Sequence, residues 1–150
     1  MMTLLIPEQI SRRWSTIRQS MEQALPAGTR NTVDLSGNVL SMLLGGRMQC
    51  WIFHEGSTVI AIMTTMINKD ECDGTNVLFI YSFYGFTNIE GKHWIEGTRT
   101  LMRWAAKNRV SRLTAYSSAL PIIKIAQKLG GDTSQTLIVI PVTDALEEDE

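Results

Sequence analysis

The sequence predicts an α/β domain in which a central mixed β-sheet carries helices on its faces. Residues 76–117 contain an apolar strand, a glycine-containing turn, an amphipathic helix and a second strand, which together form a βαβ crossover with locally parallel strands. An antiparallel hairpin is expected before it, over residues 48–67, and two helices are expected within residues 7–46. The predicted order is therefore ααβββαβαβ, in one domain over residues 1–142 with an acidic, disordered tail over residues 143–150.

The two N-terminal helices are predicted from their ends and from their apolar spacing. Pro7 suits the first turn of a helix, and the stretch after residue 25 ends that helix. Thr32 or Asp34 is expected to cap the second helix, and Gly45-Gly46 is expected to end it, because glycine adopts positive φ without steric cost. The apolar stripe of the first helix consists of Ile10, Trp14, Ile17 and Met21.

The predicted hairpin follows the second helix. Its strands run from Met48 to His54 and from Thr58 to Ile67, with a turn at Glu55-Gly56-Ser57 between them. The polar stretch from Asn68 to Thr75 is expected to be a loop. Its acidic residues do not have the spacing of a calcium-binding loop, so we interpret it as solvated rather than as a cation site.

The βαβ unit and the C-terminal elements complete the predicted sheet. The strand from Val77 to Tyr84 is almost continuously apolar, which is typical of a strand buried on both faces. A helix from Glu90 to Asn108 and a short strand from Ser111 to Ser117 follow it. The last helix is predicted from Leu120 to Leu129, and the last strand from Thr136 to Val142.

Bulk properties exclude several classes of protein. The formal net charge of −1 argues against a nucleic-acid binder, which usually has a basic excess, and leaves only the helix face of Arg12, Arg13 and Arg18 for an acidic partner. No signal peptide and no membrane span are recognisable, so a soluble cytoplasmic protein without a membrane partner is expected. Cys50 and Cys72 are expected to be free thiols, and the histidine and cysteine spacing predicts no metal site.

Three short motifs accompany the predicted order of elements: the W-x-x-I pair Trp14 and Ile17, the pattern L-x-x-G-x-x-Q-x-W from Leu43 to Trp51, and the helix end at residues 104–107. With these motifs the chain resembles the GNAT superfamily of acyl-CoA N-acyltransferases, and in particular the small GNAT-like proteins encoded by bacteriophages. The resemblance covers about residues 8–142. It implies acyl transfer to an amine acceptor, and for a phage-encoded protein it implies the host cytoplasm or the virion as location.

The resemblance also implies a site for acetyl-CoA or CoA. In the superfamily, a bulged strand opens its backbone to the pantetheine arm, and a Q/R-x-x-G-x-G/A loop wraps the pyrophosphate at a helix start. Here Asn88 stands where Gln or Arg is usual and His93 where Gly or Ala is usual, while Gly91 matches the pattern. The residues expected to bind the cofactor are Phe83, Tyr84, Gly85, Asn88, Gly91, Lys92 and His93.

The catalytic residues implied by the resemblance are less complete. Ala126 occupies the position of the superfamily's usual Tyr acid, and Tyr116 is the candidate that would replace it. An attacking amine must lose a proton, and His54, Glu55 and Glu90 are the candidate bases. The alternative interpretation is a catalytically inactive GNAT-fold protein that binds a protein partner from phage or host, such as a phage particle component or a host-interaction factor.

Overall fold

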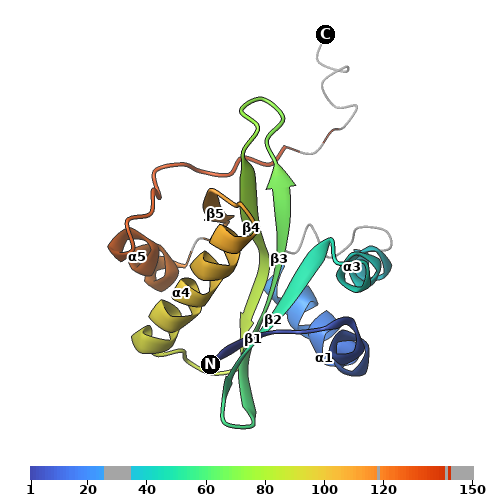
Figure 1. Cartoon of the computed structure of the whole chain (residues 1–150). Helices are drawn as coiled ribbons and strands as arrows, with labels where there is room; N and C mark the ends of the chain where they lie inside the picture. The colour runs from blue at the N-terminus through green and yellow to red at the C-terminus, as the bar shows by residue number, and fades with distance from the viewer. Residues whose placement is uncertain (26–34, 118, 141, 143–150) are drawn as a thin grey trace. The chain divides into compact units, whose positions relative to one another are not determined.

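The computed structural model describes residues 1–25, 35–117, 119–140 and 142, and it is shown in Figure 1. The chain divides into two compact units, Met1–Ala115 and Tyr116–Glu150, which are described separately. The elements of the first unit are β1 (Met2–Leu4), α1 (Pro7–Ala24), α3 (Leu35–Leu44), β2 (Met48–Glu55), β3 (Thr58–Lys69), β4 (Asn76–Gly85), α4 (Gly91–Lys107) and β5 (Arg112–Ala115). The second unit contains α5 (Leu120–Lys128).

The first unit is built on a five-stranded sheet in the order β1-β2-β3-β4-β5. All neighbouring strands are antiparallel except β4 and β5, which are parallel and are joined by α4. The mixed α/β fold, the hairpin and the βαβ unit predicted from the sequence are therefore confirmed. Gly56 has a φ of 56° in the two-residue connection between β2 and β3, as a type II′ turn requires.

Helices cover both faces of this sheet (Figure 1). On one face, α1 and α3 bury a cluster that includes Ile17, Leu43 and Cys50. On the other face, α4 packs Leu101 and Ala105 onto β2, β3 and β4. The alternation of side chains along each strand explains why Trp51 and Ile52, adjacent in β2, belong to different clusters.

The ends of the N-terminal helices follow the predicted chemistry where the structure describes them. Pro7 is the first residue of α1, and the Gln9 side chain accepts a hydrogen bond of 3.0 Å from the Ile6 backbone N–H. The helix α3 ends at Leu44, and Gly46 follows with a φ of 78°. The caps expected at Thr32 or Asp34 lie outside the described residues.

Two elements differ from the prediction. The sequence does not predict β1, because Met2–Leu4 is too short to show a strand pattern. In the structure it pairs with Trp51–Phe53 of β2. The strand predicted over 136–142 is absent from residues 136–140 and 142, which form no helix or strand. Its β-branched composition is strand-like, but propensity alone does not provide the paired neighbour that a strand requires.

Two strands were predicted with the wrong extent or burial. The strand predicted over 111–117 is limited to β5, where Arg112–Ala115 pair with Val77–Ile80. In β4 only Leu78 and Ser82 are fully buried, and most other residues are partly exposed, so the strand is not buried on both faces. No helix of the described chain is long and apolar enough to cross a bilayer.

Candidate functional site

The strand β4 contains a bulge at Tyr81. Thr64 of β3 is paired with Ser82, and the next residue, Thr65, is paired with Ile80. Tyr81 is therefore the extra residue of β4, because two neighbouring residues of β3 oppose positions that are two apart in β4. A bulge bends its strand and increases the local twist, so β4 changes direction at this point.

The pairing between β4 and β5 stops at the same bulge. Its last pair is Ile80 with Ala115, and no strand of the described chain pairs with Ser82–Gly85 on the side away from β3. A strand with one neighbour presents a row of unpaired backbone N–H and C=O groups on its other side. The second half of β4 is therefore an opened edge, defined here as the outer backbone of Ser82–Gly85.

Buried hydroxyl groups support the bulge from β3. Thr64 Oγ1 and Ser82 Oγ lie 2.5 Å apart, and both residues are buried. Thr65 accepts a hydrogen bond of 3.0 Å from Trp51 Nε1 and donates one of 2.9 Å to the Gln49 side chain. The contact of Thr64 with Ser82 joins β3 to β4, and the contacts of Thr65 join β3 to β2. These hydrogen bonds fix the position at which the opened edge begins.

Tyr81 itself is half-buried beside the cluster under α1. Burial raises the pKa of its phenol above the ordinary value, since the charged phenolate would lose hydration. The phenol is therefore protonated at neutral pH, and it is a hydrogen-bond donor located at the start of the opened edge.

The chain turns from the opened edge directly into α4. The Trp94 indole donates a hydrogen bond of 3.1 Å to the Ile89 carbonyl, which fixes the turn against the first turn of the helix. Glu90 is the N-cap residue and makes no capping hydrogen bond with its side chain. Apart from its two chain neighbours and the backbone of its own helix, no atom of the described chain lies within 4 Å of the position that a Cβ on Gly91 would occupy. The start of α4 is thus open, with backbone N–H groups and the positive end of the helix dipole available to an anion.

Charges beside the start of α4 partly cancel. The Lys92 ammonium lies 3.4 Å from the Glu90 carboxylate, and both side chains are largely exposed. Such a surface pair is weak, so Lys92 is free to contact another anion at small cost. Asn88, one of the expected cofactor-binding residues, is also exposed in the turn.

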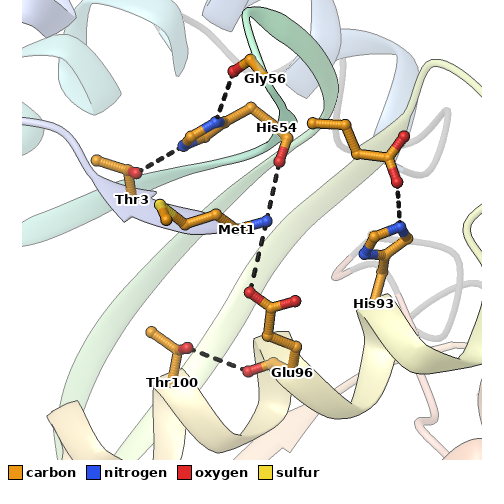
Figure 2. Close-up of polar contacts among 8 residues, drawn as sticks. Met1, Thr3, His54, Gly56, His93, Glu96 and Thr100 are labelled. Carbon is orange, nitrogen blue, oxygen red and sulfur yellow. Dashed lines mark hydrogen bonds and ion pairs between the residues drawn. The ribbon is translucent and has the colours of Figure 1, made fainter.

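His93 does not lie over the open start of the helix. Its ring contacts the Glu55 carboxylate at the end of β2, a contact drawn in Figure 2, and only 14% of the side chain is exposed. Its backbone N–H donates to the Glu90 carbonyl at 3.0 Å. The structure therefore places an expected cofactor residue against an expected base, and the backbone N–H of His93 already has an acceptor.

His54 is held by two hydrogen bonds at the end of the sheet (Figure 2). Its Nδ1 lies 3.1 Å from the Gly56 carbonyl, which can only accept, so this nitrogen carries a proton. Its Nε2 lies 2.9 Å from Thr3 Oγ1. The contact at Nδ1 therefore lies within the hairpin turn, and the contact at Nε2 joins the hairpin to β1.

The expected bases lie away from the bulge along the sheet. His54 is paired with Val59, and Val59 precedes Thr64 by five residues on β3. Five residues of a strand span roughly 17 Å, so His54 and Glu55 lie near the turn that leads to α4 rather than beside Tyr81. Their assignment as catalytic bases stays a prediction.

The remaining expected residues are divided between the two units. Phe83 packs in the first unit, with its ring centroid 4.8 Å from that of Trp94 and 5.7 Å from that of Phe53. The Tyr84 ring makes an edge contact with Phe86 at 5.3 Å. Tyr116 belongs to the second unit, where 65% of it is exposed. Within the described residues, no group of three or more His, Cys, Asp and Glu side chains is arranged to hold a metal ion.

Sequence reasoning missed the residues at the bulge. Tyr81, Ser82 and Thr64 were considered only as strand residues. Their signal is a short polar residue inside an apolar run, such as Ser82 within NVLFIYSFYG and Thr64-Thr65 within the preceding strand. A buried hydroxyl needs a partner, and here the partners lie on neighbouring strands at the position of the bulge.

Comparison with known proteins identifies this arrangement of elements. No family model and no curated protein sequence matches the chain. Solved structures do match over nearly their full length. An aminoglycoside acetyltransferase, HMB0005, from an uncultured soil metagenomic sample is 14% identical, with a TM-score of 0.72 over 95% of this chain and 98% of that one.

Two other matches have the same fold, and their acceptors differ from one another. The aminoglycoside N-acetyltransferase AAC(6')-Iy, solved with a bisubstrate analogue of CoA, is 16% identical with a TM-score of 0.68, and covers 95% of this chain and 99% of its own. A ribosomal-protein-alanine N-acetyltransferase from Brucella melitensis biovar Abortus 2308 is 13% identical with a TM-score of 0.64 over 95% and 99% of the two chains. The chain therefore has the fold of GNAT acetyltransferases, and identities this low bear on the fold alone.

Proposed function

We propose that this protein is an N-acyltransferase that binds acetyl-CoA or a related acyl-CoA and transfers the acyl group to an amine. The observation that carries the proposal is the opened edge of β4, which starts at the Tyr81 bulge and leads into an uncapped helix start at Gly91. Structural neighbours solved with CoA or acetyl-CoA support the same class of ligand.

The residues present fit the two parts of CoA that need protein contacts. The opened edge offers backbone donors and acceptors to the amide groups of the pantetheine arm. The N–H groups at Gly91 and Lys92 suit the pyrophosphate, and Gly91 leaves room for it to approach. The ring of His93 does not interfere, since it contacts Glu55 on the hairpin.

The chain's own groups then orient the reactants and manage protons. A bound acyl-CoA supplies an activated thioester. The opened edge fixes the arm beside the bulge, where the Tyr81 phenol holds a proton that a departing thiolate would need. Tyr116 is the second candidate acid, and His54, Glu55 and Glu90 are the candidate bases for the attacking amine.

Calorimetric titration with acetyl-CoA and with CoA tests the binding half of the proposal. Binding should also raise the melting temperature, because a ligand at about 100 times its Kd stabilises the folded state by about 2.7 kcal/mol. Gly91→Trp should abolish binding by filling the open start of α4. Met102→Trp, at an exposed position of the same helix, is the matched control and should leave affinity unchanged. No binding at millimolar ligand, or full affinity in Gly91→Trp, would overturn the proposal.

Release of free CoA thiol in the presence of amines tests the chemical half. One structural neighbour is an aminoglycoside acetyltransferase solved with sisomicin, so sisomicin belongs in the panel beside simple alkylamines and peptide N-termini. Tyr81→Phe should lower kcat by about 10²-fold or more if the phenol acts as the acid, with CoA affinity retained. Equal turnover in Tyr81→Phe would remove Tyr81 from the mechanism and leave Tyr116 as the candidate acid.

The second candidate function is a GNAT-fold binding or structural protein without catalysis. It is favoured by Ala126, which supplies no acid at the position where the superfamily's Tyr is expected. Under this proposal the partner is a phage or host protein, and CoA is either bound without turnover or not bound. Thiol release above the uncatalysed rate with any amine of the panel would contradict it.

A further inference from the structure

A groove of about 570 Å³ lies on the α1 face of the sheet, near the β2–β3 hairpin. Its lining comes from β1, α1, β2, the hairpin turn and β3, and none of it comes from β4, α4 or β5. Its size is within the range of sites that bind small molecules. The groove is therefore separate from the opened edge and from the start of α4.

Three polar side chains of α1 line the groove: Gln9, Arg12 and Arg13. The two arginines carry positive charge and donate hydrogen bonds. Arg12 is 3.1 Å from the Glu8 carboxylate, whereas Arg13 has no carboxylate partner among the residues that the structure describes. The Oε1 of Gln9 already accepts from Ile6, so the amide NH₂ of Gln9 is the part left to bind a ligand.

No acidic side chain lines the groove to balance these donors. At its other end the neutral form of His54 has both nitrogens engaged, one with Thr3 and one with the Gly56 carbonyl, as Figure 2 shows. Since Arg12 is already paired with Glu8, the unmatched charge comes from the guanidinium of Arg13. A guanidinium offers paired donors in a planar fork, and this geometry suits a carboxylate or a phosphate.

The floor of the groove is apolar. Leu5 and Ile52 are 6% and 7% exposed, and the partly buried Val59 lies beside them in the lining. Because Leu5 and Ile52 are already almost fully buried, the apolar area still open to a ligand is small and includes the partly buried Val59. Covering it with hydrocarbon is favourable by about 25 cal/mol per Å² of apolar area.

We infer that this groove binds a small organic anion, in which a carboxylate or phosphate is attached to a short apolar chain. The anionic group lies against Arg12 and Arg13, and the chain covers Leu5, Ile52 and Val59. An acidic peptide fits less well, because its polar backbone would lie on the apolar floor. The site is independent of the proposed acyl-CoA site.

Calorimetric titration of the full chain with octanoate, octyl phosphate, octanol and inorganic phosphate tests this inference. Saturable 1:1 binding of octanoate or octyl phosphate is expected, with a Kd on the order of 1 mM or lower. The tighter of these two ligands identifies the anionic group as carboxylate or phosphate. Octanol lacks the anionic group and inorganic phosphate lacks the hydrocarbon chain. Each should therefore bind at least about tenfold more weakly than the preferred amphiphilic anion.

Variants of α1 assign the binding to the groove. Arg12→Ala/Arg13→Ala should weaken binding of the preferred anion by about tenfold or more. Arg18→Ala is the control, because Arg18 lies on the same helix outside the groove and its side chain is also exposed. The double variant should keep its affinity for acetyl-CoA.

Four results would overturn the inference. The first is the absence of saturable binding by either amphiphilic anion, and the second is an equal loss in Arg18→Ala. The third is tighter binding of a glutamate-rich peptide than of octanoate and octyl phosphate. The fourth is a parallel loss of acetyl-CoA affinity in the double variant, which would assign the groove to the cofactor.

Discussion

Replacement of Gly97 by alanine should destabilise the protein although alanine is the better helix former. Gly97 lies inside α4 and faces Phe53 of β2. An added Cβ would lie 2.5 Å from Phe53 Cε2 and 2.9 Å from Cζ. Carbon atoms in contact are normally 3.5–4.0 Å apart, so the helix or the ring must move by about 1 Å.

The ring of Phe53 has little room to move. It is 5% exposed, and it makes an edge contact with Phe83 at a centroid distance of 5.7 Å. Overpacking of this kind costs about 1–3 kcal/mol, while the helix propensity of alanine over glycine returns about 1 kcal/mol. Because the closest contact is so short, we place the cost near the top of its range and expect a net loss of about 1–2 kcal/mol.

Urea denaturation measures this loss as a lower midpoint at unchanged slope, by about 0.5–1 M for a slope near 2 kcal/mol/M. Gly91→Ala is the control in the same helix, where the new Cβ meets no atom, and should stay within about 0.5 kcal/mol of the parent. In a Phe53→Leu background, Gly97→Ala should become neutral or stabilising. A gain of about 1 kcal/mol for Gly97→Ala in the parent protein would refute the close packing of α4 on β2.

Three further predictions concern the buried hydroxyl pair and the buried thiol. Thr64→Val or Ser82→Ala alone leaves a buried hydroxyl unpaired and should cost about 1–3 kcal/mol in urea denaturation, whereas the double variant should cost less than the sum of the two. Burial raises the pKa of the Cys50 thiol to about 12, so at pH 8 a disulfide reagent should modify Cys72 rapidly and Cys50 only after unfolding. Between pH 9 and 12 the folded chain keeps the Cys50 proton, whereas the unfolded chain loses it. The free energy of unfolding should therefore fall as the pH rises through this range, by up to about 1.4 kcal/mol per pH unit. Rapid modification of both thiols in the native protein would contradict the burial of Cys50. A difference in the free energy of unfolding between the parent and Cys50→Ala that stays constant from pH 9 to 12 would contradict the raised pKa.

Much of the fold could be predicted because it depends on local patterns. The apolar spacing of α1, the glycines after α3 and the turn at Gly56 each specify one local structure, and all three are found. The strand β1 was missed because three residues carry too little pattern to distinguish a strand from a disordered end. It is held by long-range hydrogen bonds, such as that from the Leu5 N–H to the Cys50 carbonyl at 2.9 Å.

The C-terminal strand was wrongly predicted for the opposite reason. Residues 136–140 have a strong strand composition, yet Ile138, Val139 and Ile140 are each more than 75% exposed. A β-branched composition favours a strand when a partner strand is available to pair with it. The sequence of the segment does not identify that partner. The same limit applies to the bulge at Tyr81, which is a property of the register between two strands.

The structure also shows what the histidine at position 93, a departure from the GNAT loop pattern, means for the approach of a phosphate. From the sequence, a histidine at position 93 places a bulky ring where a phosphate must approach. In the structure that ring contacts Glu55, and the helix start at Gly91 remains open. The proposed cofactor contacts are made by the backbone of Ser82–Gly85 and of the start of α4. Contacts of this kind depend on the strand register and on the position of the helix, so they tolerate changes of side chain. Catalysis, in contrast, depends on particular side chains, and position 126 carries Ala where the resemblance implies a Tyr acid. Under the proposed function, cofactor binding and turnover should therefore be separable, and a chain that binds CoA with no detectable turnover would assign the missing activity to side chains and not to the fold.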